Sequence, residues 1–361
     1  MKNIFGKAML LATALLFSIT GTSCSSDDSP VPEKEKTYDM SGFAKGADVS
    51  WLTEMEQDGV KFYDQNGKAT ECMWLLRDLG TNAIRLRVWV NPEGGWCAKN
   101  DVIAKACRAQ ALGYRLMIDF HYSDTWADPG NQKVPAAWQN YTFEQMKQAV
   151  ADHTKDVLSA LKERGVTNVE WVQVGNETRD GMLFSSDEAV TGKASKNAAN
   201  FAAYVNAGYD AVKAVYPQAK VVVHVDEGNN LGRYTWLFGE LKKKGGKWDI
   251  IGMSLYPEDN NWQDLTTNCL KNIKTLSEQY NCNVIVSEIG MWWGSDQAAP
   301  MMKKMVDGCK AISTCEGIFY WEPEVYNNWK PANYSTLGWD AYTKGAFDNS
   351  GKPTAVFDAY K

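Results

Sequence analysis

Several common signals of cofactor binding are missing from this chain of 361 residues. No two cysteines stand at the C-x-x-C spacing of a structural zinc site, which argues against a zinc module. No glycine-rich phosphate loop follows any apolar run, which argues against a nucleotide-binding sheet. The formal net charge is −6 and no basic patch stands out, so nucleic acid is not an expected partner.

One apolar run stands apart at the N-terminus, over residues 8–19. It follows Lys2 and Lys7 and is too short to cross a bilayer as a helix, so we expect an export signal. Cys24 comes directly after it, as at the processing site of a bacterial lipoprotein, and is the expected lipidation site. Gly21 stands where a larger aliphatic residue is usual, which leaves simple secretion as the alternative.

The segment after Cys24 is polar. Residues 25–28 read Ser-Ser-Asp-Asp and resemble the acidic stretch of surface-exposed lipoproteins in Bacteroides-type bacteria. We expect a signal peptide over residues 1–23, a flexible tether over 24–39 and a single folded domain over 40–361. The expected location is the outer membrane, facing the cell surface or otherwise the periplasm. The lipid anchor is the only membrane attachment that we expect, and the expected state is a monomer.

Seven cysteines remain when Cys24 is set aside. An exported protein can form disulfides, but an odd number leaves at least one thiol free. Two local pairs are candidates, Cys269 with Cys282 and Cys309 with Cys315. The sequence leaves their connectivity open.

From residue 43 onward, short apolar runs alternate with longer helix-like stretches. Each run is almost continuously apolar, as expected for strands that are buried on both faces. Eight runs separated by helices predict an α/β fold with one closed (β/α)₈ TIM barrel, and an open doubly wound sheet is the alternative. The runs cover residues 43–50, 82–90, 115–122, 169–175, 220–225, 249–256, 283–287 and 317–321.

Polar side chains gather at the carboxyl ends of these runs, which is where barrels of this class carry their active sites. Two of the only three histidines are among them. The end residues are Ser50, Trp51, Arg85, Arg87, Trp89, Asp119, His121, Tyr122, Asn176, Glu177, His224, Asp226, Tyr256, Glu288, Trp321 and Glu322.

Two glutamates in this set indicate glycoside hydrolysis. Glu177 ends the fourth run in an Asn-Glu pair, and Glu288 ends the seventh, so the two should face each other across the barrel mouth. Hydrolysis of a glycoside needs one protonated carboxyl group as acid and one ionised carboxylate as nucleophile. Exposed strand-end residues without a role are the alternative for either glutamate alone, and a much weaker one for both together.

The motifs around these residues resemble clan A of the retaining glycoside hydrolases, and within it family 53, the arabinogalactan endo-β-1,4-galactanases. The resemblance covers essentially residues 40–361. It rests on Gly46-Ala47-Asp48-Val49-Ser50-Trp51, Asn82-Ala83-Ile84-Arg85-Leu86-Arg87-Val88-Trp89, Asp119-Phe120-His121-Tyr122-Ser123-Asp124-Thr125-Trp126-Ala127-Asp128-Pro129-Gly130 and Gln173-Val174-Gly175-Asn176-Glu177-Thr178. It implies cleavage of β-1,4-galactan, the side chain of pectic polysaccharide, with Glu177 as acid/base and Glu288 as nucleophile.

Chemistry and resemblance together suggest roles for the neighbouring residues. Asn176 is expected to bind the sugar 2-hydroxyl. Arg87 should hold Glu288 ionised, and Tyr256 should hydrogen-bond it. Sugar contacts are expected from His121, Ser123, Asp124, Thr125, Trp126, His224, Asp226, Trp292 and Trp321. For the polar members of this set, a purely structural hydrogen bond is the alternative.

No cofactor is expected for this chemistry. Some bacterial relatives hold calcium between the loops after strands seven and eight, and Asp296 and Asp348 fall near those places. The strand-seven loop is short and lacks an acidic glycine-rich stretch, so two solvated aspartates are the preferred interpretation.

Two other functions compete with galactan cleavage. One is another clan A activity, such as a mannanase, a cellulase or an exo-acting β-galactosidase. The other is a glycan-binding surface lipoprotein without catalysis, which the presence of both glutamates disfavours.

Overall fold

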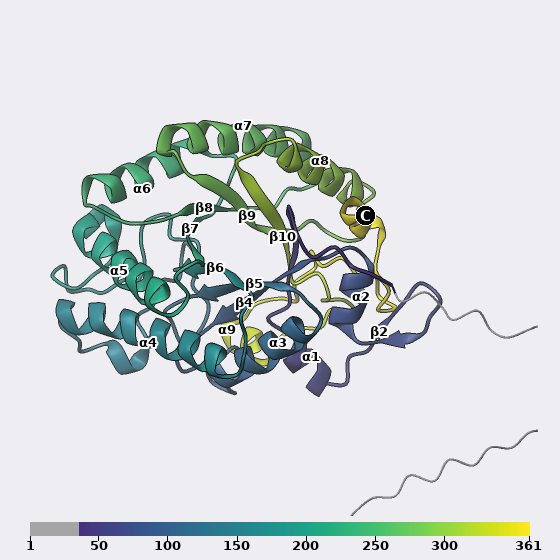
Figure 1. Ribbon diagram of the computed structural model, residues 1–361, viewed down its shortest axis with the longest axis horizontal. Helices are drawn as coiled ribbons and strands as arrows, with labels where there is room; N and C mark the ends of the chain where they lie inside the picture. Colours follow the sequence, from purple (N-terminus) through teal and green to yellow (C-terminus); the bar gives the residue numbers. More distant parts are fainter. Residues whose placement is uncertain (1–35) are drawn as a thin grey trace, which may run out of the picture. The chain divides into compact units, whose positions relative to one another are not determined.

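A computed structural model describes residues 36–361, and the predictions for the export signal, Cys24 and most of the tether lie outside these residues. Eight parallel strands close into a barrel in the order β1-β10-β9-β8-β7-β6-β5-β4, which confirms the predicted (β/α)₈ fold (Figure 1). The barrel strands are β1 (Ala44–Asp48), β4 (Ala83–Val88), β5 (Arg115–Phe120), β6 (Val169–Val174), β7 (Lys220–Val225), β8 (Ile250–Leu255), β9 (Asn283–Ile289) and β10 (Cys315–Trp321).

Helices connect successive strands and surround the barrel (Figure 1). They are α1 (Leu52–Gln57), α2 (Cys72–Asp78), α3 (Lys99–Ala111), α4 (Phe143–Glu163), α5 (Ala194–Val215), α6 (Leu231–Lys243), α7 (Trp262–Tyr280), α8 (Ala298–Lys310) and α9 (Ala332–Leu337), with 3₁₀ turns at Ala136–Trp138 and Ala355–Tyr360. Helix α4 begins at a capping box, in which Thr142 and Gln145 exchange side-chain and backbone bonds, so two otherwise free N–H groups are satisfied. The sequence did not predict the small hairpin of β2 (Phe62–Tyr63) and β3 (Ala69–Thr70).

One buried side chain from each strand fills the barrel below the carboxyl end of the strands, toward their amino ends. This layer consists of Ala44, Ala83, Met117, Trp171, Val222, Ile250, Ile285 and Phe319. The Phe319 ring lies so close to Gly46 that a Cβ there would stand 2.2 Å from it. This apolar layer separates the charged residues at the amino ends of the strands, such as Lys220 and Glu316, from the polar side chains at the carboxyl end, where barrels of this class carry their active sites.

The seven cysteines within residues 36–361 are all free thiols, so neither candidate disulfide is formed. In the same part of the chain, no helix is both long and apolar enough to span a membrane.

Candidate active site

A cleft of about 260 Å³ opens at the carboxyl end of the barrel, and both predicted catalytic glutamates line it. Its wall is strongly aromatic. The lining residues are His121, Trp126, Ala127, Asp128, Asn176, Glu177, Tyr256, Glu288, Trp321, Tyr334, Trp339, Tyr342 and Lys344. Aromatic faces with a few polar groups between them suit a pyranose, which presents C–H faces and hydroxyl edges.

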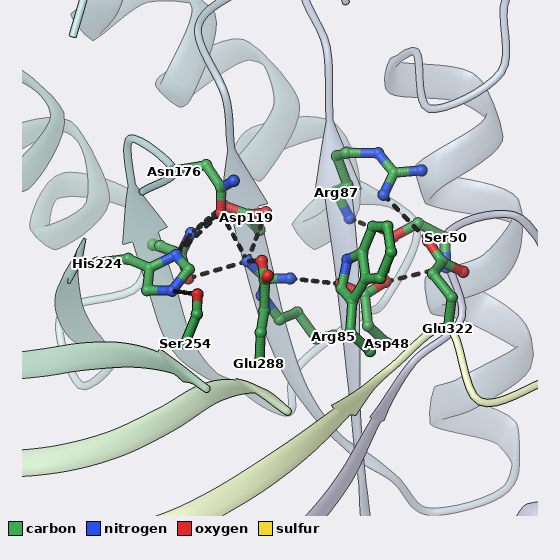
Figure 2. A network of polar contacts seen from close by, with 12 residues as sticks. Asp48, Ser50, Arg85, Arg87, Asp119, Asn176, His224, Ser254, Glu288 and Glu322 are labelled. Atoms are coloured by element: carbon green, nitrogen blue, oxygen red, sulfur yellow. Dashed lines mark hydrogen bonds and ion pairs between the residues drawn. The ribbon is translucent and has the colours of Figure 1, made fainter. Parts of the chain in front are cut away.

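Glu288 lies within β9 rather than after it, and each of its carboxylate oxygens has one partner. Arg85 Nη2 lies 2.9 Å from Oε1, and the Tyr256 hydroxyl donates to Oε2 at 2.7 Å. The contact with Tyr256 is the one expected from the sequence. The cation is not, because Arg87 was expected in the place that Arg85 occupies (Figure 2).

The contacts of the two arginines explain the correction. Arg85 lies two positions before Arg87 on β4, and it is the guanidinium of Arg85 that reaches Glu288. Arg87 instead contacts Glu322, with Nη1 3.0 Å from Oε1.

Arg87 also contacts Trp126, a residue of the cleft wall. Its guanidinium carbon lies 4.1 Å from the centre of the Trp126 ring, a cation–π contact with a residue that lines the cleft. The side chain is buried and does not line the cleft, so its predicted direct role toward the nucleophile or the sugar is wrong.

Arg85 is the hub of a buried network (Figure 2). It contacts Asp48 at 2.6 Å and Asp119 at 2.9 Å in addition to Glu288. Burial opposes the charged form of Arg85, but Asp119, Glu288 and Asp48 outweigh it, so the pKa of Arg85 is raised. The guanidinium thus remains a permanent cation beside the nucleophile candidate.

Glu177 follows β6 in a left-handed backbone conformation with φ of 46°, which is uncommon for a residue with a side chain and occurs often at functional sites. Its Oε1 accepts a hydrogen bond of 2.7 Å from the Ser254 hydroxyl. No cation contacts this carboxylate within the described residues.

The two glutamates differ in what opposes their burial. Burial, followed by the charges of Glu288 and Asp226, raises the pKa of Glu177 well above its usual value. Burial also raises the pKa of Glu288, but Arg85 and the Tyr256 hydrogen bond both act in the opposite direction. Of the pair, Glu177 is therefore the carboxyl that retains its proton for donation, and Glu288 is the one whose ionised form is better stabilised.

Four of the expected sugar-contacting residues do line the cleft: His121, Trp126, Asn176 and Trp321. His121 bonds through Nε2 to Asp119 at 3.0 Å, and its Nδ1 accepts from Trp89 Nε1 and Ala127 N–H. Asn176 is held by its amide, whose Nδ2 donates to the Ala127 carbonyl at 2.8 Å. The indole Nε1 of Trp126 is buried without a hydrogen-bond partner among residues 36–361.

The other predicted contacts lie elsewhere. Asp124 ties two loops together by accepting from the backbone N–H groups of Asn91 and Ala136. Asp226 pairs with Arg179 and Arg233, and His224 is fully buried. Ser123 and Thr125 do not line the cleft. Trp292 is exposed and lies outside the cleft, in an adjoining hollow that shares Lys344 with it and is also lined by Pro257, Glu258, Asp259, Asn260, Met291 and Thr343.

Several lining residues were missed by the sequence analysis. Tyr334, Trp339, Tyr342 and Lys344 come from the long segment after β10, which has no strand pattern to place it. Asp128 was included only as part of a motif and was given no role. The Trp-Ala-Asp-Pro run around it was the one sequence feature that could have indicated a place in the cleft, because it lies in the loop after β5.

The two weak candidates for calcium ligands, Asp296 and Asp348, do not come together. Asp348 accepts from Ser350 and from the N–H of Lys352 within one turn, and Asp296 is exposed. Across residues 36–361, no group of three or more potential ligand side chains could hold a metal ion. Asp296 and Asp348 therefore do not belong to a shared carboxylate cluster, and no chemistry is assigned to a metal ion.

Comparison with known proteins agrees with the geometry. Residues 44–360 match the model of glycosyl hydrolase family 53. An endo-beta-1,4-galactanase of Bacillus subtilis (strain 168) is 30% identical over 341 residues, covering 84% of this chain and 75% of that protein. The family 53 catalytic domain of Ignisphaera aggregans aligns with a TM-score of 0.77 at 28% identity, covering 89% and 96% of the two chains.

A structure from a study of two fungal beta-1,4-galactanases aligns with a TM-score of 0.76 at 26% identity, covering 89% of this chain and 99% of that one. The family match spans almost the whole barrel and includes both glutamates of the cleft. The chain is therefore a glycoside hydrolase that belongs to family 53.

Proposed function

We propose that this protein is an endo-acting β-1,4-galactanase, which hydrolyses the galactan side chains of pectic arabinogalactan with retention of anomeric configuration. The observation that carries the proposal is the pair of carboxyl groups in one cleft, Glu288 buried and Glu177 partly buried, of which only Glu288 contacts a cation within residues 36–361. The names of the relatives support β-1,4-galactan as the substrate.

The reaction follows from this division of labour. Glu177 delivers its proton to the glycosidic oxygen while the Glu288 carboxylate attacks the anomeric carbon and forms a galactosyl–enzyme ester. Glu177, now ionised, then takes a proton from water, and the resulting hydroxide opens the ester with release of free Glu288. No step needs a cofactor, so a chelator should leave the rate unchanged.

The aromatic cleft supplies the binding surface. Trp126 contacts Trp321 and Tyr334, and all three contact Trp51, edge to face with ring centres 5.1 to 5.9 Å apart. Rings packed in this way have little freedom left to lose, so they favour a sugar that stacks on them.

Export as a lipoprotein anchored at Cys24 is part of the proposal, as is action as a monomer at the cell surface or in the periplasm. The support is the sequence alone: a basic start, a short apolar run and a cysteine after it. Radiolabelled palmitate should label the wild-type protein in cells, and Cys24→Ser should not be labelled.

Activity on a panel of polysaccharides tests the function. The proposal expects hydrolysis of unbranched β-1,4-galactan, with a rapid fall in viscosity, and negligible hydrolysis of β-mannan and carboxymethylcellulose. Glu177→Gln and Glu288→Gln are the matched controls for a contaminating activity. Preferred cleavage of mannan or cellulose would replace the substrate assignment, release of galactose alone would replace the endo assignment, and binding without any hydrolysis would indicate a glycan-binding protein.

A further inference from the structure

We infer that Ser254 is a positioning residue for the acid/base: its hydroxyl fixes which oxygen of Glu177 carries the catalytic proton, and His224 fixes the direction of that hydroxyl. The inference rests on the proposed function in one respect, the role of Glu177. Neither Ser254 nor this use of His224 was expected, since His224 was predicted to contact the sugar.

The three side chains form a continuous chain across neighbouring strands (Figure 2 shows the His224–Ser254 part). Ser254 lies on β8, His224 on β7 and Glu177 directly after β6. His224 Nε2 is 2.7 Å from Ser254 Oγ, and Ser254 Oγ is 2.7 Å from Glu177 Oε1. Ser254 is 1% exposed and His224 is 0% exposed, so bulk water does not compete for these bonds.

The donors around His224 determine which atom donates in each hydrogen bond of the series His224–Ser254–Glu177. The backbone N–H of Glu177 donates to Nδ1 at 3.4 Å. Gln173 Nε2 lies 3.1 Å from Nδ1, but its two hydrogens face Asp119 Oδ1 at 2.5 Å and Asn176 Oδ1 at 2.9 Å, so the Glu177 N–H is the donor to the ring. Nδ1 is therefore the acceptor nitrogen and Nε2 carries the hydrogen. Nε2–H donates to Ser254, whose own hydrogen is then free only for Glu177.

Asn176 lies at the same nitrogen but does not change this assignment. Its Oδ1 is 3.0 Å from Nδ1, and it already accepts from Arg85 and Gln173. The opposite amide orientation is disfavoured because Nδ2 donates to the Ala127 carbonyl.

His224 remains neutral while it does this. Burial, and then the positive charge of Arg85, lower the pKa of His224 well below its usual value, with Asp119 acting in the opposite direction. A neutral imidazole is a donor of fixed direction that adds no charge beside the acid.

The consequence concerns the two oxygens of Glu177. Oε1 is occupied as an acceptor, so the exchangeable proton resides on Oε2, which has no hydrogen-bond partner within the described residues. The left-handed backbone at Glu177 is held by the same strand, since Thr178 donates twice to the His224 carbonyl, at 2.8 and 2.9 Å. Strand β7 thus holds the backbone of Glu177 through the His224 carbonyl, and through the His224 side chain and Ser254 it determines which oxygen of Glu177 carries the proton.

Other charged and titratable groups also face Glu177, and the test must separate Ser254 from them. They are Glu288, Asp226, Asp128, Arg179, Tyr256 and Tyr234. None of them is changed by a substitution at Ser254, so a shift in that variant reports the hydroxyl.

The experiment compares pH profiles of kcat on galactan for wild type, Ser254→Cys and Ser254→Ala, with circular dichroism as the folding check. Loss of a donor to the ionised form raises the pKa of Glu177. The basic limb of the profile, where kcat falls as the pH rises, should move upward by about one pH unit in Ser254→Ala. In Ser254→Cys the limb should lie between those of Ser254→Ala and wild type, because a thiol is a weaker donor than a hydroxyl. The kcat at neutral pH should fall about tenfold with little change in KM, while an aryl galactoside with an activated leaving group should be much less affected.

Ser287→Ala is the matched control, because Ser287 is an equally buried serine on β9 whose hydroxyl has no partner among residues 36–361. Its basic limb should coincide with that of wild type. Coincidence of the Ser254→Ala and Ser254→Cys limbs with wild type would overturn the inference. If Ser254→Ala does not fold, Ser254→Cys decides alone. Glu177→Gln distinguishes failure of the proposed function from failure of the inference about Ser254. Full galactan activity in Glu177→Gln would reject the acid/base assignment itself, whatever the serine variants do.

Discussion

Nη2 of Arg85 lies 2.9 Å from Oε1 of Glu288, and this contact connects the nucleophile to the most buried charge network of the barrel. Asp48 and Asp119 share the same guanidinium. The ion cluster therefore does two things: it opposes protonation of Glu288 and it fixes the height of the carboxylate in the cleft.

Replacement of Arg85 by methionine should damage both stability and activity. Three carboxylates would lose their buried cation, and removal of one partner from such a cluster typically costs about 3–5 kcal/mol. The pKa of Glu288 should rise because burial would act without the opposing charge, so the acidic limb of the kcat/KM profile should move to higher pH. Thermal unfolding and a pH profile measure the two effects.

Arg87→Met is the comparison variant for this prediction. It removes a buried cation of similar depth that contacts Glu322 rather than Glu288. It should also lower the melting temperature, but its acidic limb should stay within a few tenths of a pH unit of wild type. If Arg87→Met moves the limb and Arg85→Met does not, the assignment of the cation to Glu288 is reversed.

Tyr256→Phe should weaken the nucleophile without unfolding the barrel. The lost hydroxyl is the donor to Oε2 of Glu288, and a hydrogen bond to a charged group contributes about 1.5–3 kcal/mol. We expect kcat/KM to fall roughly ten- to hundredfold and the acidic limb to move upward. Tyr342→Phe removes another cleft hydroxyl, one that donates to backbone carbonyls, and should leave that limb in place. Equal behaviour of the two variants would contradict the prediction.

A second carboxyl pair, Glu322 and Glu324, should make stability depend on pH. Both side chains are fully buried. Burial, followed by the charge of Asp48, raises the pKa of Glu322 to about 8. Burial and the charge of Glu322 raise the pKa of Glu324 well above its usual value.

Because the folded-state pKa exceeds the unfolded value, the stabilisation from holding these protons is complete below about pH 4.5 and is lost as the pH rises toward 8. Glu324→Gln removes one of the two titrations. The decline in melting temperature between pH 5 and pH 8 should therefore be smaller in Glu324→Gln than in wild type. Parallel curves for the two proteins would show that Glu324 is ionised in the folded state already at pH 5.

A shortened chain tests the predicted domain boundary. A protein that begins at Thr37 should fold and should cleave galactan at the rate of the full-length protein, because the polar segment before it offers little apolar area to bury. Melting temperature and kcat of the two proteins are the comparison. A fall in either would assign part of the tether to the folded domain.

The sequence predicted the barrel well because its strands are apolar runs with polar ends, a pattern that depends on local composition. All eight barrel strands overlap their predicted runs. Glu177, Glu288, Tyr256 and Asn176 could be found in the same way, since a strand end fixes which mouth a residue faces.

The choice between Arg85 and Arg87 could not be made from the sequence. Both residues lie on the same side of β4, two positions apart, and only the side-chain contacts of the folded barrel show which one reaches Glu288. His224 was misplaced for a similar reason: a strand-end histidine can point to the cleft or between strands, and the Ser254 hydroxyl that receives it lies on the next strand. The aromatic wall from Tyr334 to Tyr342 comes from the short helix α9 and the irregular residues after it, whose course is set by tertiary contacts rather than by periodicity.

The central claim, that Glu288 attacks the anomeric carbon while Glu177 donates the proton, is tested most directly by trapping the ester intermediate. An activated 2-deoxy-2-fluoro-β-galactoside slows breakdown of the intermediate, because the fluorine destabilises the oxocarbenium-like transition state. Peptide mass spectrometry of the inactivated wild-type enzyme should find one fluorogalactosyl group, on Glu288, and Glu288→Gln should remain unlabelled under the same conditions. A label on Glu177 or on any other residue would contradict the account.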